Sequence, residues 1–133
     1  MFLSRVNKWE ASIKKLRNNE MTLQEFVNAN EGKVLYYTVP FFENEKGPFA
    51  NALNAPGSDV MFFPAFSNPA DLESHVAAIG GKEHLVIKGD LKGVLDLLDS
   101  HLLIRDWGVV IDPNSQDSVG IPPHVRVQPK CLR

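Results

Sequence analysis

The stretch from Leu85 to Ser115, LVIKGDLKGVLDLLDSHLLIRDWGVVIDPNS, has the densest apolar pattern in the chain and sets the predicted fold. Its apolar ends, 85–87 and 109–111, are typical of strands buried on both faces. Asp90 is a preferred residue for the N-cap of a helix. The apolar residues that follow it have helical spacing and predict one buried helix face: Leu91, Val94, Leu95, Leu98 and Leu102. A strand–helix–strand unit of this length normally forms a right-handed parallel crossover.

The N-terminal segment 4–17 is predicted to be a helix, with an apolar stripe that contains Trp9 and Ile13. The segment is also basic, and Lys8 is one of its cations. Two interpretations are open. The helix docks on a membrane surface or an acidic partner, or it packs on the rest of its own, more acidic domain. We favour the second interpretation, because the apolar stripe is narrow.

Three further helix and strand signals come before the central stretch. Thr22 and Glu25 have the spacing of a capping box, which predicts a short helix through about Ala29. Residue types predict strands at 34–39 and 59–66. Pro64 cannot donate a hydrogen bond to a neighbouring strand, so the second strand requires an edge or a bulge at this point.

Asn68 and Pro69 then suit the N-cap and first position of another helix. Between the two strands, residues 41–58 form a long predicted loop, and such loops are often functional. Its aromatic side chains Phe41, Phe42 and Phe49 belong either to the core or to an exposed recognition surface. After the central stretch, segment 121–127 is predicted to be extended, as an edge strand or a cover over the sheet.

The predicted fold is α/β, with α+β as the alternative. We expect a single domain with a mixed or mostly parallel sheet of four to five strands, flanked by helices and preceded by an N-terminal helical pair. Within it, residues 1–31 form a helical segment packed on the core, residues 32–127 form the α/β domain, and residues 128–133 are a tail.

Bulk properties limit the function classes. The chain has 133 residues, a net charge of −2 and one cysteine, Cys131. The charge does not favour nucleic acid as a partner, and one cysteine cannot form an internal disulfide. No run approaches the ~18 apolar residues of a membrane span, and the first residues lack the apolar region of a signal peptide. We therefore expect a cytoplasmic protein.

The sequence contains no catalytic or cofactor motif that we can identify. His75, His84, His101 and His124 are far apart and form no metal-binding pair with another histidine or with Cys131. The sequence has no GxSxG, GxGxxG or GxxxxGK[ST] segment. We therefore expect no catalytic residues, no metal and no cofactor, although a triad that converges in space leaves no trace in sequence order.

Polar residues follow each predicted strand of the α/β region. In open α/β sheets, ligands bind beyond the carboxyl ends of the strands, near helix N-termini. These positions either cap helices and close turns, or they line a pocket for a small polar ligand. The candidate ligand-binding residues are Ser67, Asn68, Asp90, Asp112, Asn114 and Ser115.

Three segments, 62–72 (FFPAFSNPADL), 89–98 and 108–115 (GVVIDPNS), occur in an order and spacing that resemble the bacterial SseB family, named for enhanced serine sensitivity. The resemblance covers roughly 33–127. Asp112 and Asn114 depart from the family's Asn-Pro-Gly-Ser turn, and the family's second domain has no counterpart here. The resemblance implies an α/β domain and supplies no catalytic residue.

Two functions follow as hypotheses. The first is a non-enzymatic binding or regulatory module that recognises a protein partner through Trp9, Lys8, Phe41, Phe42 and Phe49. The alternative is a binder of, or enzyme for, a small amino-acid-like ligand at the strand ends, where the amino acid is implied by the serine phenotype of the resembled family. The sequence leaves homo-oligomerisation open.

Overall fold

The computed structural model describes residues 8–38, 53–54, 59–78, 86–100 and 104–126. The helices of these residues are α1 (Lys8–Arg17), α2 (Leu23–Ala29), α3 (Pro69–Ala78), α4 (Leu91–Asp99) and α5 (Pro123–Arg126). Their strands are β1 (Val34–Tyr37), β2 (Leu53–Asn54), β3 (Met61–Ala65), β4 (Ile87–Asp90), β5 (Gly108–Ile111) and β6 (Val119–Ile121).

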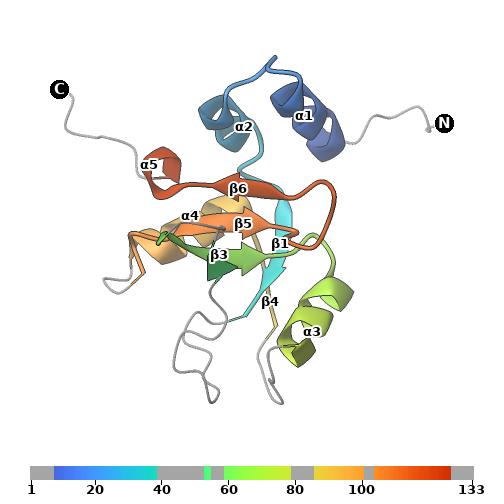
Figure 1. Ribbon diagram of the computed structural model, residues 1–133, viewed down its shortest axis with the longest axis vertical. Coiled ribbons are helices and arrows are strands. Elements are labelled where there is room, and N and C mark those ends of the chain that lie inside the picture. The colour runs from blue at the N-terminus through green and yellow to red at the C-terminus, as the bar shows by residue number, and fades with distance from the viewer. Residues whose placement is uncertain (1–7, 39–52, 55–58, 79–85, 101–103, 127–133) are drawn as a thin grey trace.

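The strands form two sheets. One has the order β2-β3-β5-β6, in which β3 and β5 are parallel and the other neighbours are antiparallel. The other is the antiparallel pair β1-β4. The two sheets meet at an isolated antiparallel bridge, where Tyr36 and Phe66 exchange backbone hydrogen bonds of 2.7 and 2.9 Å. β1 therefore lies between β4 and the carboxyl end of β3 (Figure 1).

The predicted α/β class and mixed sheet are confirmed, but the described strands do not form the single sheet that we expected. The described strands divide between sheets of four and two, and only β3 and β5 pair in parallel. The predicted parallel crossover between the two ends of the 85–115 stretch is wrong, because β4 pairs with β1 while β5 pairs with β3 and β6. The connection between the parallel neighbours β3 and β5 is longer, and it contains α3, β4 and α4.

Pro64 satisfies the constraint that the sequence places on it. The carbonyl of Ala65 accepts a hydrogen bond from the N–H of Asp112, so the backbone groups of Ala65 face β5. Successive residues of a strand direct their N–H and C=O groups to opposite sides, and the backbone groups of Pro64 therefore face away from β5. Pro64 thus has its missing N–H on the opposite side, between the pairing with β2 and the bridge at Phe66. No described ladder hydrogen bond is lost there.

The helix of the central stretch packs as its spacing predicts. Leu91, Val94, Leu95 and Leu98 are all buried in α4, and they share one core cluster with Val109 and Ile111 of β5. Gly108 is required by a close approach in this region. A Cβ at that position would lie 2.5 Å from the carbonyl oxygen of Ile121 on the neighbouring strand.

The N-terminal helices contribute buried side chains to the core cluster. In Figure 1, α1 and α2 lie side by side next to β6, and α3 lies at the opposite end of the molecule, beside β1. The capping box of α2 is confirmed: Thr22 and Glu25 each accept a hydrogen bond from the other's backbone N–H. Trp9 is only 8% exposed and packs on Phe26, with a distance of 5.0 Å between ring centroids.

The C-terminal part differs from the prediction of a single extended segment. β6 ends at Ile121, and Pro123–Arg126 forms a short helix, α5. Pro123 is its first residue, a position where the missing N–H and fixed φ of proline are compatible with a helix. The start of the predicted N-terminal helix and the tail 128–133 lie outside the described residues.

Candidate ligand site at the strand ends

The site begins where β3 and β5 end. The two strands are parallel, with Ala65 aligned to Ile111, so their carboxyl ends lie at the same edge of the sheet. The backbone N–H of Asp112 continues this pairing by donating to the carbonyl of Ala65 at 2.8 Å. The residues that follow the two strands, Phe66–Asn68 and Asp112–Ser115, are thereby brought together.

Asp112 joins these two segments through its side chain. Its carboxylate accepts two hydrogen bonds from Ser67, one from the backbone N–H at 2.8 Å and one from Oγ at 2.7 Å. Its backbone has a φ of 54°, in the left-handed region that aspartate tolerates better than most residues. The carbonyl of Asp112 also accepts the N–H of Ser115 at 2.9 Å, which closes the turn after β5.

Asn68 starts α3 as its N-cap. Its Oδ1 accepts a hydrogen bond of 2.7 Å from the N–H of Ala70, and its carbonyl accepts the N–H of Asp71. The helix then carries Asp71 and Ser74 three residues apart, a spacing that puts two side chains on the same face. Both side chains line a cavity at the strand ends.

This strand-end cavity has a volume of about 300 Å³. Its described lining contains two carboxylates, two hydroxyls, one amide and the ring of one buried phenylalanine, and no lysine, arginine or histidine. The lining residues are Phe66, Asp71, Ser74, Asp112, Asn114 and Ser115. Such a cavity favours a ligand with a positive charge or several hydrogen-bond donors.

The electrostatics of the neighbouring His75 are those of a packed residue. Its ring lies 5.4 Å from the ring of Phe66, in a small apolar cluster with Leu72 and Val76. Burial lowers the pKa of His75 below its ordinary value of 6.5, so the neutral form is favoured. The histidine does not line the cavity.

Five of the six predicted ligand residues come together at this edge. Asp112, Asn114 and Ser115 line the cavity, Ser67 bonds to Asp112, and Asn68 caps the adjoining helix.

Asp90 has a different place and does not line the cavity. Its carboxylate caps α4 by accepting the N–H of Gly93 at 2.8 Å, and β1 lies between its strand and β3. The side chain therefore has the capping function that its position in the sequence predicts.

Sequence reasoning missed Asp71, Ser74 and Phe66 as lining residues. A signal for the first two was present, because they follow the predicted N-cap Asn68 at helical spacing. No comparable signal marks Phe66, whose ring position depends on the packing of α3 against β1.

The residues put forward for protein recognition divide into three groups. Lys8 is exposed, whereas Trp9 is buried between Phe26 and the Nζ of Lys33, which lies 5.0 Å from the centroid of its ring. Trp9 thus packs within the chain rather than on a free surface. Phe41, Phe42 and Phe49 lie outside the described residues.

The described residues hold no group of three His, Cys, Asp or Glu side chains arranged to bind a metal ion. Among their helices, none has the length and apolar character needed to cross a bilayer.

Comparisons with protein-family models, curated proteins and solved structures found no match to this chain.

Proposed function

We propose that this chain is a non-enzymatic binding module that holds a small ligand with an ammonium group in the strand-end cavity. One observation carries the proposal: the cavity lies at the carboxyl ends of two parallel strands, and its described lining contains Asp71 and Asp112 but no cationic side chain. Ligands of open α/β sheets commonly bind at this edge. The same edge supports the alternative that the sequence offered, an amino-acid-like ligand.

The size of the cavity supports a ligand of about the size of an amino acid. A volume of about 300 Å³ is at the lower end of the range for small-molecule sites. The hydroxyls of Ser74 and Ser115 and the amide of Asn114 supply further donors and acceptors for a polar ligand.

The sign of the charges makes the proposal specific. An ammonium group is attracted by Asp71 and Asp112, whereas a carboxylate in the same cavity is repelled by them. An amino-acid amide, which is a cation, should therefore bind more tightly than the free amino acid, which also carries a carboxylate. A small carboxylate without an amine should bind least.

The experiment is a titration of the ¹⁵N-labelled protein with L-serinamide, L-serine and acetate, followed by amide chemical shifts. We expect L-serinamide to shift the amides of Asp112, Asn114 and Ser115 and those of the first turn of α3, L-serine to do so more weakly, and acetate not at all. Equal binding of acetate, or shifts that lie only elsewhere in the chain, would contradict the proposal.

A matched pair of variants tests the charge. Asp71→Asn keeps the size of the side chain and removes its charge, so the affinity for L-serinamide should fall several-fold. The control Asp59→Asn makes the same change two residues before the start of β3, at the end of the strand away from the cavity. Asp59 does not line the cavity, so this substitution should leave the affinity unchanged. An equal effect of both substitutions would indicate a general field rather than a site.

Three statements from the sequence remain predictions. Recognition of a protein partner is one, because Trp9 is buried and the aromatic loop lies outside the described residues. Membership of the SseB family is another, and its serine phenotype is the reason for choosing serine derivatives as probes. The third is a cytoplasmic location, which the single cysteine supports.

A further inference from the structure

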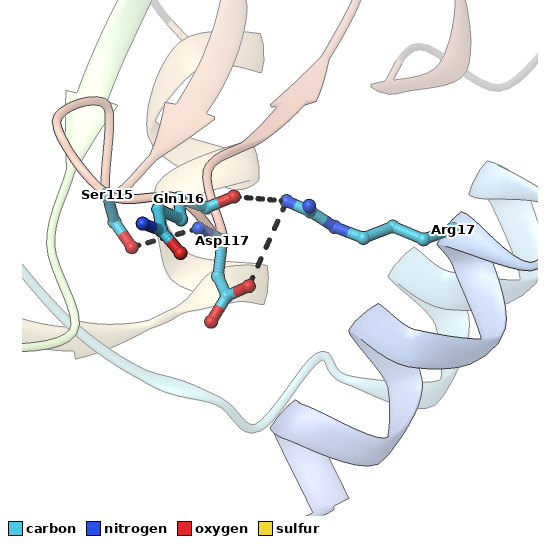
Figure 2. Close-up of polar contacts among 4 residues, drawn as sticks. All are labelled: Arg17, Ser115, Gln116 and Asp117. Atoms are coloured by element: carbon cyan, nitrogen blue, oxygen red, sulfur yellow. Dashed lines mark hydrogen bonds and ion pairs between the residues drawn. The ribbon is translucent and has the colours of Figure 1, made fainter.

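The turn between β5 and β6 contacts two parts of the molecule. Three of its first residues, Asp112, Asn114 and Ser115, line the strand-end cavity. Its next two residues contact α1: Nη2 of Arg17 donates a hydrogen bond of 2.6 Å to the carbonyl of Gln116 and lies 4.0 Å from Oδ1 of Asp117 (Figure 2). One short turn thus connects the proposed ligand site with a helix that is 99 residues away in sequence.

Ser115 connects the two halves of this turn. Its Oγ accepts the N–H of Asp117 at 3.0 Å (Figure 2), and its carbonyl accepts the N–H of Ser118 at 3.3 Å. The same residue lines the strand-end cavity. A displacement of Gln116 and Asp117 would therefore move Ser115, because the hydrogen bonds within the turn couple their positions.

α1 provides a fixed point for Arg17. The helix is anchored in the core by Trp9 and Ile13, which are both buried. Between α1 and the turn, however, there is an open groove of about 310 Å³, which both Arg17 and Asp117 line. The guanidinium of Arg17 spans this groove, so its hydrogen bond is a defined contact between the helix and the turn in a place where close packing is lacking.

From this geometry we propose that Arg17 is a positioning residue for the strand-end site. It holds the Gln116–Asp117 peptide and thereby keeps Ser115 and Asn114 at the cavity. The guanidinium is suited to this task, since it donates to the Gln116 carbonyl while its charge attracts Asp117. The inference rests on the proposed function, because it concerns the affinity of that same cavity.

The test compares three substitutions in α1 by titration with L-serinamide under conditions where every variant is folded. Arg17→Ala should weaken binding by about two- to fivefold, the range expected for a contact whose charged side chains are 50% and 65% exposed. Arg17→Lys should recover part of this loss, because its ammonium group can still donate a hydrogen bond. Lys15→Ala removes an exposed cation from the same helix and should have no effect.

Amide shifts of the ligand-free protein separate positioning from a loss of global stability. Arg17→Ala should shift the amides of Ser115, Asp117 and Ser118 and leave those of α4 unchanged. A variant that only lowered stability would keep both the wild-type shifts and the wild-type affinity, because the folded fraction still dominates.

The outcomes also separate the two proposals. If wild-type protein binds L-serinamide and Arg17→Ala binds it equally well, the positioning role is wrong and the proposed function stands. If wild-type protein does not bind, both are wrong.

Discussion

Asp112 is expected to stabilise the pairing of β3 and β5, and three substitutions separate its side-chain and backbone contributions. Asp112→Asn keeps an acceptor for the N–H of Ser67 and tolerates the φ of 54°. Asp112→Gly removes both hydrogen bonds but adopts this φ without strain. Asp112→Ala removes both hydrogen bonds and also strains the backbone, because its Cβ disfavours the left-handed region.

The magnitudes follow from these differences. Each hydrogen bond to a charged group contributes ~1.5–3 kcal/mol, and the half-buried position of Asp112 favours the lower end. The loss of both bonds in Asp112→Gly should therefore lower the free energy of unfolding by about 3 kcal/mol. The backbone strain adds about 1 kcal/mol for alanine, which gives about 4 kcal/mol. For asparagine we expect about 2 kcal/mol, because one neutral hydrogen bond of ~1 kcal/mol replaces two charge-assisted ones.

Urea denaturation followed by circular dichroism measures these values, with Asp59→Asn as the control. The expected order of stability is wild type, asparagine, glycine and alanine. In a separate thermal scan, the melting temperature should fall by about 4 °C for each kcal/mol. If glycine and alanine were equally destabilising, the left-handed backbone would make no contribution. If all three variants lay within about 0.5 kcal/mol of wild type, the argument for Asp112 would be refuted.

Three further predictions concern stability. Gly108→Ala should lower the free energy of unfolding, measured by urea denaturation, by ~1–3 kcal/mol, because its Cβ would meet the carbonyl of Ile121. The control Gly32→Ala places no heavy atom within 4 Å of the new Cβ and should stay within about 0.5 kcal/mol of wild type. Equal costs for the two substitutions would contradict the close approach. Burial lowers the pKa of His75, so the unfolded chain binds a proton at a higher pH than the folded protein does. The free energy of unfolding should therefore fall as the pH drops from 6.5 towards the lowered pKa. His75→Gln should reduce this slope, and an unchanged slope would contradict the prediction. Asp90→Ala should cost ~1 kcal/mol in thermal unfolding through loss of the α4 cap, and Asp90→Ser should restore most of it; failure of serine to do so would argue against capping.

Local features of the fold were predictable because their partners are close in sequence. The capping box at Thr22 and Glu25 spans three residues, and the caps at Asn68 and Asp90 act on N–H groups two and three residues later. The buried face of α4 follows from helical periodicity alone. Each of these predictions requires only the conformation of one short segment, which the sequence of that segment specifies.

Strand pairing was not predictable in the same way. The apolar runs 85–87 and 109–111 are similar in sequence and flank one predicted helix, and the common topology of such a unit favours a parallel crossover. In the structure, β4 instead pairs with β1, which comes some fifty residues earlier in the chain. Period-2 patterns specify which face of a strand is buried and do not specify its neighbour.

The candidate site contains residues that the sequence could predict and residues whose place depends on strand pairing or helix packing. The rule that ligands bind at the carboxyl ends of parallel strands correctly grouped Ser67, Asn68 and Asp112. It failed for Asp90, because the rule was applied to a strand whose place in the sheet was wrong. Arg17 could not be predicted at all, since its contact with Gln116 depends on how α1 packs against the larger sheet.

Asp71 and Asp112, the two carboxylates of the cavity, have different roles. The carboxylate of Asp112 is already bonded twice to Ser67, so its charge is largely used to hold β3 and β5 together. Asp71 lies exposed in the first turn of α3, where the helix dipole favours a negative charge but few contacts depend on it. Loss of charge at Asp71 should therefore reduce ligand affinity more than stability, and loss of charge at Asp112 should reduce stability more than affinity. This contrast follows only if the cavity binds a cation, because a purely structural turn would give Asp71 no role in any titration.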